Sequence, residues 1–202
     1  MIANQRISQI APPSYERVAY DFQGKSWPGQ LWAGLTTPPR VRLLEDWIVI
    51  MPGGLRVIVP RGFVTDGASI PRPLWGLLSP FGVLLEGALL HDFGYQYGYL
   101  LAPYRIDQAW NIASLRLRAE YAAIYGPYIP VYVGKPQRFF DDLLQAVTVD
   151  ITGASAQAWS ARQALRLFGM LAWARYRSCG PAAITPNSLH IPGVDSTGLA
   201  IA

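Results

Sequence analysis

Cysteine and histidine are scarce in this chain. The single cysteine, Cys179, excludes an intrachain disulfide and any zinc site built from several cysteines. Only two histidines occur, His91 and His190, which is too few for hydrolases that bind their metals through several imidazoles. The sequence also contains neither a Gly-x-Ser-x-Gly nucleophile elbow nor a glycine-rich phosphate loop. Several common enzyme classes are therefore excluded.

Charge is sparse as well, and no segment suits a membrane span. Charged residues make up 15% of the 202 residues, and the formal net charge is +4. This mild basic excess contains no run of like charges, so we expect no specific nucleic-acid partner. The longest apolar stretch, 74–90, is interrupted by Ser79 and Pro80 and contains Glu86, so we expect no transmembrane helix. The first 15 residues lack an apolar core, which predicts no signal peptide.

Aromatic residues, in contrast, are plentiful. The chain has 7 Trp and 11 Tyr, and 51% of its residues are hydrophobic. Trp and Tyr are frequent at protein interfaces because each combines an apolar ring with a polar group. The composition therefore leaves two interpretations open, assembly with other subunits or a large buried core.

The order of patterns predicts an α+β fold, with an N-terminal extended arm and a β-hairpin followed by a bundle of about four helices. The first 40 residues hold five prolines and little periodicity, typical of an extended arm with a short strand at 17–22. Two β-rich runs, 41–51 and 55–60, are separated by Pro-Gly-Gly, which predicts the hairpin. The predicted divisions are an arm over 1–40, a core domain over 41–180 and an irregular tail over 181–202.

Apolar periodicity predicts the helices over 84–95, 106–120, 138–149 and 156–177. An aromatic loop is expected over 126–136. In the longest helix, an apolar stripe runs from Ala161 through Phe168 and Leu171 to Ala172, while Arg162 and Arg166 face away.

The segment Thr-Asp-Gly-Ala-Ser-Ile-Pro at 65–71 is typical of a tight turn that leads into a helix. Asp66 and Ser69 can accept hydrogen bonds from nearby backbone N–H groups, with Ser69 as the helix N-cap. One interpretation is that this segment is purely structural. The other is that Thr65, Asp66 and Ser69 form a binding element in the same pocket as His91.

A second motif, Leu-His-Asp-Phe-Gly-Tyr, lies on the first predicted helix. His91 and Tyr95 share a helix face, and Asp92 is rotated by about 100°. An imidazole suits a general base acting on water, and a carboxylate suits a hard cation such as calcium. A carboxylate from another helix would orient the imidazole and be supported by Tyr95, with Asp107 and Asp142 as candidates. The alternative is a core histidine whose polar atoms are satisfied by hydrogen bonds.

These motifs resemble the DUF1353 proteins, which are found largely in bacteriophages and prophages. The resemblance follows the family pattern over Val59–Arg72 and at Leu90, His91, Asp92 and Tyr95. The run Arg-Phe-Phe-Asp-Asp that ends at Asp142 is similar to a third block, and Leu165–Gly169 to the final helix. The resemblance covers about residues 41–175 and places Asp142 at the family aspartate, with Asp107 as a rival. It implies a phage origin but carries no biochemical function.

Two functions follow as expectations. The first is a structural protein of the phage virion, in the tail or baseplate region, made in the host cytoplasm. Its partners would be other phage subunits, in a homo-oligomer or a tail complex that the two ends of the chain contact.

The second function rests on a similarity to phospholipase A2, whose helix also bears His-Asp-x-x-Tyr. In that family the histidine activates water, a remote aspartate orients it, and the adjacent aspartate binds calcium. The resemblance implies a phage hydrolase acting on lipid or cell envelope, with His91 as the base, Tyr95 and Asp142 supporting it, and Asp92 as a calcium ligand. The chain lacks the flanking cysteines and the glycine-rich calcium loop of that family.

Overall fold

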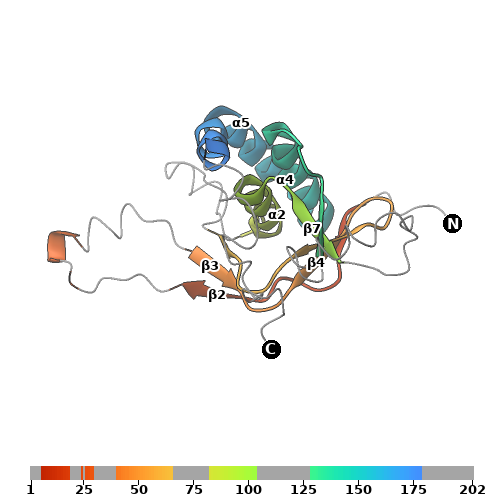
Figure 1. Ribbon diagram of the computed structural model, residues 1–202, viewed down its shortest axis with the longest axis horizontal. Helices are drawn as coiled ribbons and strands as arrows, with labels where there is room; N and C mark the ends of the chain where they lie inside the picture. The colour runs from red at the N-terminus through yellow and green to blue at the C-terminus, as the bar shows by residue number, and fades with distance from the viewer. Residues whose placement is uncertain are drawn as a thin grey trace, which may run out of the picture.

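Antiparallel strands form one side of the protein, and three helices lie against them in a mixed α+β arrangement (Figure 1). The computed structural model describes residues 6–18, 24, 26–29, 40–65, 82–103 and 128–178. The helices that pack against the strands are α2 (Leu85–Tyr97), α4 (Gln137–Thr152) and α5 (Ser155–Ser178), and residues 27–29 form a short helical turn.

The larger sheet has five strands in the order β1-β4-β5-β7-β8. These strands are β1 (Ser8–Gln9), β4 (Trp47–Ile50), β5 (Arg56–Val59), β7 (Leu100–Pro103) and β8 (Tyr128–Val131). The predicted hairpin is confirmed, because β4 and β5 pair antiparallel from Trp47↔Val59 to Ile50↔Arg56. Its turn contains Gly53 and Gly54, whose φ values of 85° and 86° strongly favour glycine.

The smaller sheet has three strands, in the order β2-β3-β6. They are β2 (Tyr15–Val18), β3 (Arg40–Leu43) and β6 (Val64–Thr65). Both β1 and β2 fall inside the predicted arm, yet they pair with β4 and β3 of the core. Ile7 is buried, and its backbone N–H donates to Asp150 Oδ2 at 2.9 Å. Ile7 and the strands β1 and β2 are therefore packed into the fold rather than forming a separate arm.

The strands are not confined to the N-terminal part as predicted. Strands β7 and β8 follow α2 in the chain and pair with each other antiparallel. The predicted loop over 126–136 in fact contains β8. Its Pro130 suggested a loop, but β8 is the last strand of its sheet, where a residue without a backbone N–H is tolerated.

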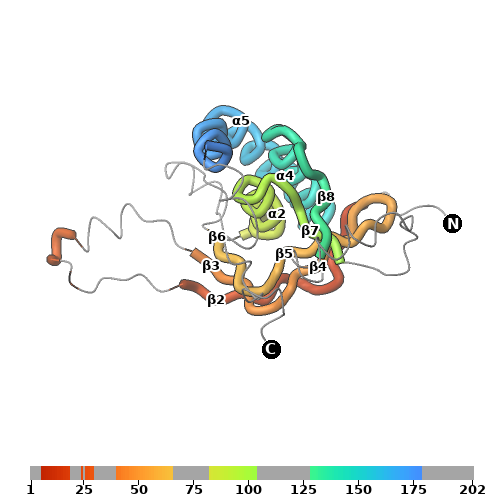
Figure 2. The backbone as a smooth tube through the Cα atoms, viewed as in Figure 1, coloured from red at the N-terminus to blue at the C-terminus, as the bar shows by residue number. Residues whose placement is uncertain are grey.

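Helix α2 lies in the middle of the molecule, between the strands and the pair formed by α4 and α5 (Figure 2). Eleven of its 13 residues are buried, as expected for a helix that is apolar on every side. The predictions of helices over 84–95, 138–149 and 156–177 are confirmed by α2, α4 and α5. The predicted helix over 106–120 and the predicted tail over 181–202 lie outside the described residues.

The buried face of α5 differs from the predicted stripe. Ala158, Ala161 and Leu165 are buried, but Phe168 and Leu171 are exposed. The prediction wrongly included Phe168 and Leu171 because α5 packs on α4 and α2 mainly through its small residues. In the described part of the chain, no helix has the length and apolar character needed to cross a membrane.

Candidate functional site

Helix α2 carries the His-Asp-x-x-Tyr motif into the protein interior. His91 is 1% exposed and Asp92 is 7% exposed. Their helix neighbours Leu89, Leu90 and Phe93 are buried completely. Because these surroundings are apolar, each polar atom of the motif needs a partner within the protein.

Both ring nitrogens of His91 are bonded to carboxylates. Nδ1 lies 3.0 Å from Asp92 Oδ1, and Nε2 lies 3.2 Å from Asp141 Oδ1 on α4. Carboxylates act mainly as acceptors, so this arrangement favours the protonated ring, in which both nitrogens donate. Burial alone lowers the pKa of His91, but the hydrogen bonds and charges of Asp141 and Asp92 outweigh it, and the pKa lies above its usual 6.5.

Asp141 is held in turn by further donors. The Tyr95 hydroxyl donates to Asp141 Oδ1 at 2.6 Å, and Gln137 Nε2 lies 3.5 Å from Oδ2. The Tyr95 ring also stacks on the imidazole, with ring centres 3.9 Å apart. Burial and the adjacent Asp141 carboxylate raise the pKa of Tyr95, which keeps its hydroxyl protonated as a donor.

Thr65 joins the cluster from the end of β6. Its hydroxyl donates to Asp92 Oδ2, so Asp92 bonds to Thr65 through one oxygen and to His91 through the other. Of the three residues predicted as a binding element, Thr65 therefore lies beside the motif. Asp66 and Ser69 lie outside the described residues.

The carboxylate that orients His91 is Asp141, which corrects the prediction of Asp142. Asp142 points away from α2 and accepts hydrogen bonds from Arg162 and Arg166 at the surface. Consecutive helix residues differ by about 100°, so only one of the two aspartates can face α2. The rival candidate, Asp107, lies outside the described residues.

Sequence reasoning missed Asp141, and it also missed Gln137 and Arg166. Asp141, Leu144 and Thr148 are all buried and follow the i, i+3, i+7 spacing of one helix face. That spacing was the available signal, since it puts Asp141 rather than Asp142 on the inward face of α4.

The cluster balances its own charge and joins four elements. The two carboxylates of Asp92 and Asp141 face the His91 ring, which is a balancing charge when protonated, and the guanidinium of Arg166, whose Nε lies 3.7 Å from Asp141 Oδ2. Gln137 Nε2 also lies 3.4 Å from the Leu165 carbonyl oxygen on α5. The interactions therefore tie β6, α2, α4 and α5 together. We call Thr65, His91, Asp92, Tyr95, Gln137, Asp141 and Arg166 the His91 cluster.

The described residues do not favour a calcium site at Asp92. Both Asp92 oxygens already have partners, and the described residues contain no group of three His, Cys, Asp or Glu side chains placed to hold a metal. These residues therefore do not support a catalytic role for calcium at Asp92.

Comparisons with known proteins place this motif in a family. Residues 41–123 match the family described as "Protein of unknown function (DUF1353)". Over 82 residues the chain is 34% identical to "Uncharacterized protein y4jT" of Sinorhizobium fredii (strain NBRC 101917 / NGR234). This alignment covers 39% of the chain and 24% of the relative, so the chain spans about a quarter of that protein. No solved structure matches the chain. The family match includes His91 but ends before Asp141. The part of the chain assigned to the DUF1353 family is therefore residues 41–123.

Proposed function

We propose that this chain is a structural protein of a bacteriophage particle that acts in assembly of the tail or baseplate region. In this proposal the His91 cluster is a buried cross-link between elements of the fold. The observation that carries it is the bonding of both His91 nitrogens to carboxylates. A general base needs a nitrogen free to accept a proton, and both nitrogens of His91 are already bonded to carboxylates.

Two further observations support the proposal. Residues 41–123 match the DUF1353 family, and the resemblance to that family implies a phage origin. The outward side of α5 also exposes several large apolar side chains, among them Leu167 and Leu171. Extended exposed apolar surfaces are typical of proteins that associate with others.

Mass spectrometry of purified particles tests this function. We expect the chain in particles released from a host that carries its gene, at a fixed ratio to the other tail proteins. An abundant host protein serves as the control for contamination. Particles that contain the other tail proteins but lack this chain would contradict the proposal.

A second candidate, a phage hydrolase, is favoured by one specific arrangement. Tyr95 holds Asp141 and Asp141 holds His91 Nε2, which is the order of groups that orients a catalytic base. For this function Asp92 would have to leave Nδ1, so that a water molecule takes its place. The arrangement resembles the oriented histidine of phospholipase A2, although neither a substrate nor calcium is required to explain it.

Fatty-acid release from phospholipid vesicles, with and without calcium, distinguishes the two functions. The structural proposal predicts that wild-type chain releases no more fatty acid than folded His91→Asn. Release by the wild type that His91→Asn abolishes would favour the hydrolase instead.

A further inference from the structure

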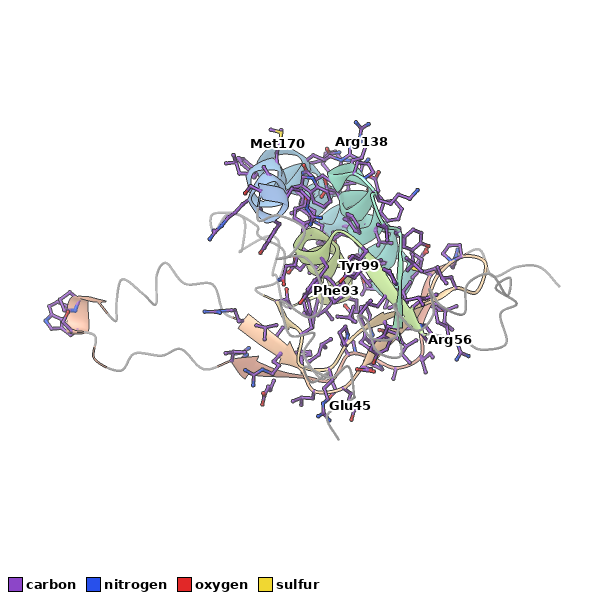
Figure 3. All side chains as sticks on the ribbon, in the orientation of Figure 1. Glu45, Arg56, Phe93, Tyr99, Arg138 and Met170 are labelled. Atoms are coloured by element: carbon purple, nitrogen blue, oxygen red, sulfur yellow. The ribbon has the colours of Figure 1, made fainter. Side chains whose placement is uncertain are left out.

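One side of α5 exposes large apolar residues over much of the helix. We call this surface the outer face of α5. At about 100° per residue, Leu167, Phe168, Met170 and Leu171 span an arc of roughly 160°. The buried residues Ala158, Leu165 and Gly169 lie on the opposite arc, whereas the buried Ala164 lies on the same side as Leu171, two turns closer to the N-terminus. Figure 3 labels Met170 on the side of α5 that faces away from the strands. The exposed fractions of the outer face are 56% for Trp159, 71% for Leu167, 55% for Phe168, 62% for Met170 and 81% for Leu171.

The outer face is large for the surface of a monomer. If a large side chain has about 200 Å² of surface, five that are more than half exposed offer roughly 600 Å². This is the upper end of the apolar patches found on single soluble proteins. Two such faces packed together would bury roughly 1,200 Å², which reaches the size of a specific interface.

The charges of α5 indicate that its occupant is apolar rather than anionic. The helix has four arginines and no acidic residue. Arg162 and Arg166 are paired with Asp142, and Arg177 donates to the Tyr95 carbonyl oxygen at the end of α2. Of the four arginines of α5, Arg175 is the one that lies on the outer face itself, and a single charge is a weak attraction for a phosphate-bearing partner.

We propose that the outer face of α5 binds the same face of a second copy, with the two helices antiparallel. A two-fold axis near Gly169 places Leu167 opposite Leu171 and Phe168 opposite Met170 of the partner. The same axis places Arg175 opposite the uncharged Gln163. A parallel pair would instead bring Arg175 of one copy against Arg175 of the other, and contact between like charges is unfavourable.

This inference deepens the proposed function, because self-association would make a dimer the unit that enters the particle. Analytical ultracentrifugation of the full chain measures it directly, over a range of concentrations. We expect a reversible dimer for the wild type. In Leu171→Glu, two charges enter the two-fold interface, so the dissociation constant should rise by at least about 100-fold. Val133→Glu is the matched control, since Val133 is also exposed but lies outside α5.

The double variant Leu167→Glu with Leu171→Lys tests the antiparallel register. Each introduced carboxylate then faces an introduced ammonium group of the partner, so dimerisation should recover at least tenfold relative to Leu171→Glu. Failure to recover, with circular dichroism and Tm unchanged, would overturn the antiparallel arrangement.

A wild-type chain that stays monomeric at all concentrations would overturn the dimer itself. If Leu171→Glu then also lowers Tm, another segment of the same chain covers the face. If the monomer instead binds neutral phosphatidylcholine vesicles, the occupant is a lipid surface. The dimer and the assembly function are tested separately. If the chain is present in particles but monomeric in solution, only the dimer is rejected. If the chain is dimeric in solution but absent from particles, only the assembly function is rejected.

Discussion

At the residue scale, two adjacent aspartates on α4 occupy opposite environments. The Asp141 side chain is 0% exposed and bonds to His91 and Tyr95, whereas that of Asp142 is 49% exposed and bonds to two arginines. Removing one partner of a buried ion pair leaves a charge without compensation, while an exposed pair contributes little. The chain therefore contains a matched pair of positions for testing the His91 cluster.

We predict that Asp141→Asn lowers the free energy of unfolding by roughly 3 kcal/mol, because His91 loses one of its two counter-charges. Asp142→Asn should change it by less than about 1 kcal/mol. Urea unfolding of both variants at pH 6 measures the difference. Equal losses for the two variants would show that the cluster does not stabilise the fold.

The protonation of His91 also makes a prediction about pH. Its pKa is raised in the folded state by Asp141 and Asp92, against the opposing effect of burial. The stabilisation is therefore complete below about pH 6.5, the unfolded value, and is lost as the pH rises through the folded pKa. In that range the stability should fall by up to about 1.4 kcal/mol per pH unit relative to His91→Asn, which lacks the titrating group.

Urea unfolding of wild type and His91→Asn between pH 6 and pH 9 measures this difference. Titrating groups that do not contact His91 affect both proteins alike and cancel in the comparison. A difference that stays constant, or that rises with pH over this range, would mean that folding does not raise the pKa of His91.

At the element scale, glycines set how closely α2 approaches α4. A Cβ atom on Gly87 would lie 2.6 Å from the Leu144 carbonyl oxygen, and one on Gly94 would overlap the Phe140 ring. Backbone atoms of a packed helix cannot move aside as a flexible side chain can. The close contact places Asp141 within hydrogen-bond distance of His91, so the glycines help to build the cluster.

We predict that Gly87→Ala destabilises the protein by about 1–3 kcal/mol, as overpacking does. A loss of stability would be informative because helix propensity alone favours alanine over glycine by about 1 kcal/mol and so predicts a gain in stability. Thermal unfolding compared with Gln96→Ala, on the same helix, measures the effect. An increase in Tm for Gly87→Ala would mean that α2 and α4 are not held at this distance.

The elements predicted correctly are those whose own residues contain the full sequence pattern of a hairpin or a helix. The hairpin of β4 and β5 has its turn residues and two β-rich runs, and the helices α4 and α5 have apolar periodicity. Strands β1 and β8 have no such signal. Their strand conformation depends on pairing with β4 and β7, which are distant in sequence, and Pro130 opposed the assignment locally.

At the scale of the whole molecule, the candidate site could be predicted only in part. Local spacing put His91, Asp92 and Tyr95 together on one helix. The requirement for a carboxylate from another helix also followed from chemistry. The choice of Asp141 over Asp142 depended on the rotation of α4 against α2, and the role of Arg166 on the packing of α5, neither of which a local pattern specifies.

The contact between Ile7 and Asp150 has a consequence for synthesis of the protein on the ribosome. The two residues are 143 positions apart, so at about 5–20 residues per second the aspartate follows the isoleucine by roughly 7–30 s. Within that interval β4 becomes available to pair with β1, but the backbone N–H of Ile7 still lacks its acceptor. Pairing of β1 with β4 can thus precede the anchoring of Ile7, which is completed only once most of α4 has been made.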